Sequence, residues 1–368
     1  MNINEFINNN ILILPKSRMN SDEPFDLFVQ NVLKEYLTSI SDLDSDLHIF
    51  RDKYTKDELI GHVALLNDAI VQTINLYLKG KKEDANIYLS KTLNHISIDD
   101  KIELAIATSG RYYYRLRNNI PCNEAKDRKA LLHVPFSKIK CASHSRYSIE
   151  GKPALYLGSN TFTCFKELDL DQKKPENCYL SKVEFESTAI RLFDLRIRLN
   201  EVKDKIRDNP DGFYAYLMMF PLVFACSIRR CKNDKDKHEY IIPQIIMKWV
   251  SERNDVNYFG IAYSSSKIED KDISERSLFY NVVIPSRSIS ENQQYCAEMM
   301  KQVKLTMPIE WCNNKINSKK TLLNYYSDFE YSPIHKHLAV KICGKINYWN
   351  TYFALNELLV ESEELKKI

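Results

Sequence analysis

Residues 131–168 read LLHVPFSKIKCASHSRYSIEGKPALYLGSNTFTCFKEL, and this stretch decides how the rest of the chain is interpreted. Its apolar run, Ala154-Leu-Tyr-Leu157, follows a Gly-Lys-Pro turn, which predicts a strand that starts after the turn. Arg146 lies ten residues before Tyr156 (156 − 146), and Glu167 lies eleven residues after it (167 − 156). An arginine, a tyrosine and a glutamate are therefore set at defined distances around one predicted strand.

Outward from this stretch, the chain divides into a helical N-terminal part and a mixed part. Apolar residues recur at helical spacing after Pro24, and Thr55-Lys-Asp-Glu58 is a capping box that opens a second helix. Gly80 is a typical stop for that helix, and a third helix is expected over 82–94. Later patterns favour strands at 111–117, 154–157, 179–186, 190–195, 259–263 and 278–284, and helices at 214–228, 240–252 and 354–367.

These elements predict an α+β protein with two domains. A length of 368 residues allows about two domains at ~150 residues each. We expect an α-helical N-terminal domain over 1–105 and an α+β domain over 106–368 that ends in a C-terminal helical cap. The apolar stripes of the N-terminal helices are wide enough to need cover from the second domain or from a second subunit.

The composition excludes several classes of function. Lys and Arg (52) exceed Asp and Glu (49) by only three, so no strong basic field marks a nucleic-acid binder. The chain has 8 glycines and lacks both GxGxxG and a P-loop motif, which argues against the usual nucleotide folds. No run reaches the ~18 apolar residues of a membrane span. The N-terminus also lacks the pattern of a signal peptide, so no membrane association is expected.

The cysteines and histidines indicate no metal site. The 9 cysteines are scattered without a CxxC pair, and His335-x-His337 lacks a third ligand at a suitable spacing. Scattered thiols are typical of a reducing compartment, so we expect a cytoplasmic protein without a prosthetic group.

The chain resembles the RES domain family, which is named for characteristic Arg, Glu and Ser residues. The matching pieces are Tyr114-Arg115, the block Arg146–Leu157 with its Gly-x-Pro-x-Leu-Tyr-Leu pattern, Glu167, and Gly260-Ile-Ala-Tyr-Ser-Ser265. His133-Val-Pro-Phe136 resembles a lead-in of one variant of the family. The resemblance covers about residues 110–290. The 98 residues from Glu167 to Ser265 (265 − 167) predict an insertion between about 186 and 238.

This resemblance implies an ADP-ribosyltransferase-like fold, with a split β core around a cleft for NAD+. It implies that NAD+ is the substrate of a glycohydrolase or phosphorylase, or that ADP-ribose is transferred to a protein or nucleic acid. Many members are toxins restrained by an antitoxin. The resemblance therefore implies an intracellular toxin or defence effector with a cognate antitoxin.

The residue types suit that substrate. Arg115 and Arg146 would hold the pyrophosphate through charge-assisted forks, and Tyr156 would attract the cationic nicotinamide ring. Glu167 would stabilise positive charge as the glycosidic bond breaks, and Ser265 would bind the carboxamide or the ribose. Glu167, Tyr156 and Arg146 form the predicted catalytic block. Arg111 and Arg117 remain alternatives to Arg115, and Ser264 and Ser266 remain alternatives to Ser265.

Two further interpretations use different features. Arg128-x4-His133 fits a short motif of HEPN-type ribonucleases, in which both side chains lie on one helix face for acid–base chemistry on RNA. Pro135 disfavours a helix that continues there. The other interpretation is a non-enzymatic interaction module whose helical N-terminal domain binds a partner.

Overall fold

The computed structural model divides the chain into two compact units. It describes residues 1–18, 22–45, 47–50, 54–97, 105–141, 144–170, 176–188, 190–231, 236–253, 258–287, 293–312, 337, 340–343 and 346–368. Unit 1 comprises Met1–Ala105, Ser145–Tyr147 and Asp194–Val250, and unit 2 comprises Ile106–His144, Ser148–Phe193 and Ser251–Ile368. The division differs from the expected single boundary at 105/106, because two later stretches of chain join the helical unit.

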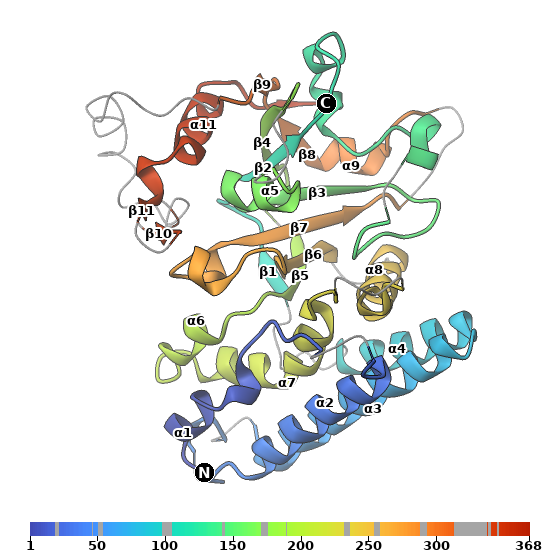
Figure 1. Ribbon diagram of the computed structural model, residues 1–368, viewed down its shortest axis with the longest axis vertical. Helices are drawn as coiled ribbons and strands as arrows, with labels where there is room; N and C mark the ends of the chain where they lie inside the picture. Colours follow the sequence, from blue (N-terminus) through green and yellow to red (C-terminus); the bar gives the residue numbers. More distant parts are fainter. Residues whose placement is uncertain are drawn as a thin grey trace. The chain divides into compact units, whose positions relative to one another are not determined.

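Unit 1 is built from helices, of which α2, α3 and α4 run side by side (Figure 1). The helices are α1 (Ile3–Ile7), α2 (Phe25–Ser41), α3 (Lys56–Leu78), α4 (Lys82–Ser97), α6 (Leu199–Lys203), α7 (Pro210–Ser227) and α8 (Ile241–Glu252). The helices expected over 82–94, 214–228 and 240–252 correspond to α4, α7 and α8.

The burial of α7 explains why residues 194–250 belong to unit 1. Every residue from Phe213 to Ser227 is buried, so this helix has no polar face to turn to water. Tyr36 of α2 stacks on Phe220 with ring centroids 4.1 Å apart. Its hydroxyl donates a hydrogen bond of 2.6 Å to the Leu217 carbonyl oxygen. Helix α7, which lies within the predicted insertion, therefore fills the core of the helical unit.

The helix ends of unit 1 follow local signals. Thr55 Oγ1 accepts a hydrogen bond from the Glu58 N–H, and the Glu58 carboxylate accepts one from the Thr55 N–H at 2.8 Å, so the capping box is confirmed. Gly80 follows α3 with φ of +79°, which glycine adopts without strain. Pro24 is the N-cap, and α2 begins at Phe25, directly after the proline.

Helix α3 is the one helix in the described residues whose length and composition would allow it to cross a membrane. The core helices of soluble proteins meet the same criterion, so the finding is weak evidence. Asn67, near the middle of α3, donates from its amide to the Leu33 carbonyl oxygen of α2 at 2.9 Å. This contact fits a helix that packs within a protein bundle.

Unit 2 is organised around a sheet, to which ten strands of the described chain contribute (Figure 1). They are β1 (Ala105–Ala107), β2 (Tyr113–Arg117), β3 (Ala154–Gly158), β4 (Tyr179–Phe185), β5 (Arg191–Leu195), β6 (Tyr258–Ser264), β7 (Tyr280–Pro285), β8 (Val303–Leu305), β9 (Ile309–Glu310) and β12 (Lys366–Lys367). The order is β1-β5-β6-β7-β3-β2-β4-β8-β12, with β9 paired to β4. Ala105 and the last two residues of β5 belong to unit 1. The six predicted strands are confirmed.

The sheet is nearly interrupted between β2 and β3. These two strands share a single antiparallel residue pair, Tyr114 with Gly158. Pairing is longer on both sides, where β2 pairs with β4 from Tyr113 to Arg117 and β3 pairs with β7 from Ala154 to Gly158. The helices and strands together confirm the mixed α and β content, while the ADP-ribosyltransferase-like architecture stays a prediction.

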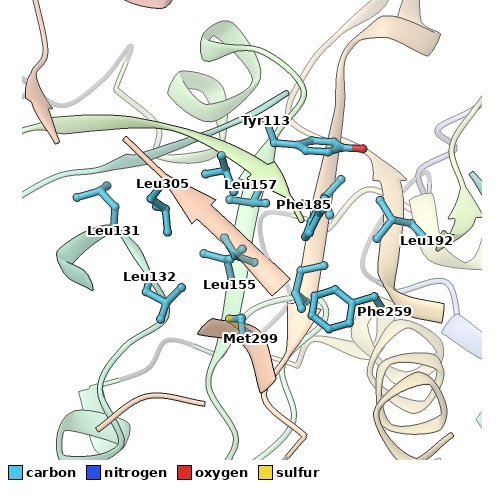
Figure 2. Packing of buried hydrophobic residues seen from close by; sticks show 14 of the residues in the cluster. Tyr113, Leu131, Leu132, Leu155, Leu157, Phe185, Leu192, Phe259, Met299 and Leu305 are labelled. Carbon is cyan, nitrogen blue, oxygen red and sulfur yellow. The ribbon is translucent and has the colours of Figure 1, made fainter. Parts of the chain in front are cut away.

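Two apolar clusters cover the two faces of the sheet, because successive strand residues point to opposite sides. In the first, Leu155 and Leu157 of β3 pack with Leu131, Leu132 and Met299 (Figure 2). In the second, strand residues from β2 and β4 pack with α5 (Thr161–Glu167) and α11 (Tyr352–Glu361). A short helix α9 (Ala297–Gln302) and the hairpin of β10 (Lys341–Ile342) and β11 (Ile346–Asn347) complete the unit.

The C-terminal helix is shorter than the sequence predicts. A helix was expected over 354–367, but α11 ends at Glu361. Lys366 and Lys367 instead pair with β8 as strand β12. The residues near the C-terminus therefore form an edge strand of the sheet and do not extend the helix.

Candidate functional site

Arg115 spans the near-interruption of the sheet. It lies on β2, and its Nη1 donates a hydrogen bond of 2.7 Å to the Tyr156 carbonyl oxygen on β3. Its buried Nε has no hydrogen-bond partner within the described residues. Of the alternatives, Arg117 donates to the Ala130 carbonyl oxygen, and Arg111 is exposed and precedes β2. Arg115 is therefore the arginine of this strand that reaches β3.

Within the described residues, no carboxylate contributes to the pKa shift of Arg115. Burial, followed by the positive charge of Arg117, lowers the pKa of Arg115 to about 10. The groups that act in the opposite direction are Cys164, Tyr156 and Tyr263, and none of them is a carboxylate. A buried cation without a counter-ion is costly, and a bound anion would relieve that cost. The environment of Arg115 thus suits a phosphate or another anionic group.

Glu167 is fixed at both its side chain and its backbone. It is the last residue of α5 and is half-buried. Its Oε1 accepts a hydrogen bond of 2.6 Å from Asn281 Nδ2, and its carbonyl oxygen accepts one of 2.7 Å from Lys267 Nζ. Its Oε2 has no hydrogen-bond partner in the described part of the chain. The carboxylate therefore has one held oxygen and one that can meet a ligand.

Helix α5 approaches β3 closely because of Gly158. A Cβ at this position would lie 2.6 Å from Cys164 Sγ and 2.9 Å from the Asn160 carbonyl oxygen, so a larger residue would push α5 away. Cys164 Sγ in turn donates to the Tyr114 carbonyl oxygen at 3.2 Å. Burial raises the pKa of the Cys164 thiol to about 12, so this cysteine is a packing residue and not a nucleophile.

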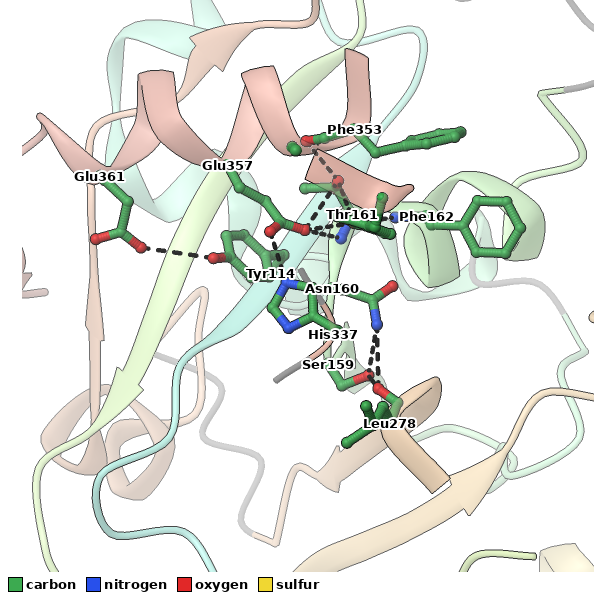
Figure 3. A network of polar contacts seen from close by, with 12 residues as sticks. Tyr114, Ser159, Asn160, Thr161, Phe162, Leu278, His337, Phe353, Glu357 and Glu361 are labelled. Atoms are coloured by element: carbon green, nitrogen blue, oxygen red, sulfur yellow. Dashed lines mark hydrogen bonds and ion pairs between the residues drawn. The ribbon is translucent and has the colours of Figure 1, made fainter. Parts of the chain in front are cut away.

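A buried polar network holds the other end of α5 (Figure 3). Glu357 of α11 accepts hydrogen bonds from the Thr161 N–H at 2.8 Å and from the Tyr348 hydroxyl at 2.6 Å, and its Oε2 lies 2.7 Å from His337 Nε2. Burial opposes the charge of Glu357, but His337 and these hydrogen bonds outweigh it and leave its pKa below the usual value. His337 thus pairs with a carboxylate, and His335 lies outside the described residues.

Ser265 is linked to Glu167 indirectly, because Lys267 forms hydrogen bonds with both residues. The Ser265 side chain is buried (1% exposed), and its Oγ accepts a hydrogen bond from the Lys267 N–H at 3.1 Å. Lys267 Nζ also bonds Asp169 at 2.8 Å, beside its contact with Glu167. Ser265 therefore shapes the turn that follows β6. Ser264 is a buried strand residue, and Ser266 is half-buried.

The guanidinium of Arg146 is bound within the helical unit. This residue belongs to unit 1, whereas Arg115, Tyr156, Glu167 and Ser265 belong to unit 2. Its guanidinium donates to the carbonyl oxygens of Cys226 (3.1 Å), Glu239 (3.4 Å) and Ile228 (2.9 Å). It also lies over the Tyr240 ring. Both terminal nitrogens are thus engaged within the helical unit, which gives Arg146 a structural role there, and its binding of pyrophosphate stays a prediction.

The ribonuclease interpretation fails on geometry. Arg128–Leu131 is a 3-10 helix that ends before His133, so the two side chains do not share a helix face. Arg128 Nε donates to the Leu305 carbonyl oxygen at 3.0 Å. His133 Nδ1 lies 2.7 Å from the Val134 carbonyl oxygen, and its Nε2 accepts from the Cys296 N–H at 2.9 Å. Burial lowers the pKa of this histidine, as expected for a neutral structural ring.

Two contact residues of Glu167 were missed by the sequence analysis. Asn281 is a single polar residue within the buried strand Tyr-Asn-Val-Val-Ile-Pro, and that contrast is a signal that could have marked it. Lys267 carries no comparable signal, because it lies in a polar turn. In the described residues, no group of three or more His, Cys, Asp and Glu side chains could hold a metal ion.

A curated protein of Bacillus subtilis (strain 168), named "Putative toxin YopC", is 30% identical to the chain over 320 residues. The match covers 81% of this chain and 68% of the relative. The chain belongs to the YopC family. The match is longer than either unit, so membership of the YopC family extends over both. No family model matches the chain, and no solved structure matches it.

Proposed function

We propose that the protein is an NAD+-consuming enzyme, a glycohydrolase or phosphorylase, that acts as an intracellular toxin or defence effector. The name of its YopC relative supports the toxin role. On this proposal the protein works in the cytoplasm, and a cognate antitoxin is its expected partner. RES-type chemistry, suggested by the motif pattern from Arg115 to Ser265, supports the choice of NAD+.

Two observations in unit 2 support the proposal: Arg115 has no carboxylate among the groups that shift its pKa, and Glu167 has a carboxylate with one oxygen held. NAD+ needs both, since its pyrophosphate is anionic and its nicotinamide ribose becomes more cationic as the glycosidic bond breaks. Arg115 offers a half-buried guanidinium with no carboxylate among the groups that shift its pKa. Glu167 offers a carboxylate with one oxygen held by Asn281.

The proposed reaction breaks the bond between the ribose C1′ and the nicotinamide nitrogen. The electron pair of that bond leaves with nicotinamide, whose ring nitrogen loses its positive charge. Glu167 stabilises the oxocarbenium-like ribose, and water or phosphate then adds to C1′ and loses a proton. Arg115 holds the pyrophosphate throughout, and half-buried Tyr156 presents an aromatic ring to the cationic nicotinamide.

The test is incubation of the purified protein with NAD+, in buffer with and without phosphate, followed by mass analysis of the products. Release of nicotinamide with ADP-ribose supports hydrolysis, and ADP-ribose 1″-phosphate supports phosphorolysis. The matched control is Glu167→Gln, which keeps the side-chain shape and removes the charge. Intact NAD+ under both conditions would refute the proposal, and ADP-ribose found on a protein or nucleic acid would identify a transferase instead. Intact NAD+ with capture of a partner by the N-terminal helices would favour an interaction module.

A further inference from the structure

We propose that Asn281 is a positioning residue that fixes the Glu167 carboxylate for catalysis. This inference rests on the proposed function, because it assumes that Glu167 acts on the substrate. It assigns a role to a residue in the middle of β7, a strand that the sequence motifs leave unassigned.

The burial of Asn281 calls for a specific partner. Its side chain is 3% exposed, and every other residue of β7 is buried as well. Buried amide groups are retained in apolar strands where they form hydrogen bonds. In the described residues, the side-chain hydrogen bond of Asn281 is the one to Glu167 Oε1, at 2.6 Å. Asn281 is therefore placed to hold the Glu167 carboxylate by a hydrogen bond.

The sheet register sets the position of Asn281. It pairs with Gly158 on β3 and with Tyr263 on β6, so it lies between the strand that carries Tyr156 and the strand that leads to Ser265. The backbone of β7 is hydrogen-bonded on both sides, so the Asn281 amide extends from a rigid strand. Because the Asn281 amide holds one oxygen of the Glu167 carboxylate, the carboxylate cannot rotate away from the substrate.

A neutral donor also suits the role of Glu167 better than a cation. An arginine or lysine on the carboxylate would neutralise the charge that the transition state needs, whereas an amide orients it and leaves the charge in place. The nearby cation, Lys267, bonds the Glu167 carbonyl oxygen and the Asp169 carboxylate, not the Glu167 carboxylate.

The experiment compares Asn281→Leu and Asn281→Asp with Asn356→Leu as the matched control. Asn356 is a fully buried amide on α11 that bonds Cys312 and Tyr352, so its loss reports the cost of removing a buried amide away from Glu167. We expect Asn281→Leu to lower kcat by about 10²-fold with KM changed by less than about 3-fold. Asn356→Leu should lower the melting temperature and keep kcat.

Asn281→Asp provides a second readout, because its side chain has nearly the same shape. Two adjacent carboxylates cannot both ionise readily, so this variant should lose activity at high pH and recover part of it as one carboxyl gains a proton and donates to the other. Among the described residues, the charged groups in ion pairs at this end of α5 are Lys166 with Asp272 and Lys267 with Asp169. They are the same in both proteins, so a shifted pH profile reports the change at 281.

Crystal structures of the wild type and Asn281→Leu separate this inference from the proposed function. We expect the Glu167 carboxylate to lose its single position in the variant. If the wild type leaves NAD+ intact but the carboxylate moves, the proposed function fails and the positioning role holds. An unmoved carboxylate, or an Asn281→Leu enzyme with wild-type kcat, would overturn the positioning role.

Discussion

Three carbonyl oxygens around one guanidinium give Arg146 a structural role, whereas in the described part of the chain Arg115 has one such acceptor and a buried Nε without a partner. By sequence, both arginines are candidates for binding pyrophosphate, and Arg146 belongs to the predicted catalytic block as well. They differ in the structure because donors that are already paired cannot bind a ligand without leaving their acceptors unsatisfied.

At the residue scale, the first prediction concerns Glu167. Glu167→Gln should lower kcat for NAD+ by about 10²–10³-fold, since one well-placed electrostatic group is lost. KM should change little, because the charge acts mainly as the bond breaks. Steady-state kinetics with a thermal melt provide the measurement. A variant with normal kcat would remove Glu167 from the mechanism.

The two arginines should respond in different ways. Arg115→Ala should raise KM and lower kcat/KM, because the guanidinium holds pyrophosphate in both ground and transition states, and Arg115→Lys should recover only part of the loss. Arg146→Ala should instead destabilise the fold, because an unsatisfied buried carbonyl costs about 1–3 kcal/mol. Melting temperature and KM, measured on both variants, distinguish the roles. A raised KM for Arg146→Ala without a lower melting temperature would restore its predicted role.

Asp194 should make the stability depend on acid. Burial disfavours its charge, but Arg196 and then Arg198 outweigh this and lower the pKa of Asp194 to about 2. The unfolded chain has a value of about 3.9, so it binds more protons than the folded chain between these limits. Stability from this group is present above pH ~4 and is lost as pH falls to ~2, by about 2 kcal/mol. Urea unfolding between pH 2 and 6 measures the free energy of unfolding, which should depend less on pH in Asp194→Asn than in the wild type.

At the element scale, the sequence predicts what local chemistry determines. Thr55 with Glu58 gave the start of α3, and Gly80 its end, since both signals act within one turn. Strand positions were also predictable from alternation. The end of α11 was not, because the pairing of Lys366 with β8 depends on a strand distant in the chain. The contact of Asn281 with Glu167 has the same long-range origin.

The capping box offers a test of α3. Thr55→Ala should lower the free energy of unfolding by about 1 kcal/mol, because the Glu58 N–H loses its acceptor. Thr38→Ala, at an exposed position within α2, is the matched control and should change stability by less than about 0.5 kcal/mol. Denaturant unfolding measures both. Equal effects would show that the box adds nothing beyond an exposed threonine.

At the scale of the whole molecule, the chain enters unit 1 three times, at 1–105, 145–147 and 194–250. A fragment that begins at residue 106 would retain α7 without the helices that cover it. Phe224 would lose Phe28, and Phe220 would lose Tyr36. We expect such a fragment to be insoluble or aggregated, as judged by size-exclusion chromatography. A soluble, monomeric and fully active fragment would contradict this expectation.

The same threefold entry affects how the protein is made on the ribosome. Helices α2 to α4 are complete by residue 97, but their apolar partner α7 is complete only at residue 227. At typical elongation rates this delay is on the order of ten seconds, during which the apolar side chains of α2 and α3 lack their native cover. Nascent chains of this length are natural clients for chaperones. Asn281, which bonds Glu167, is synthesised after α7. An activity that depends on this site therefore cannot begin before residue 281 has been added to the chain.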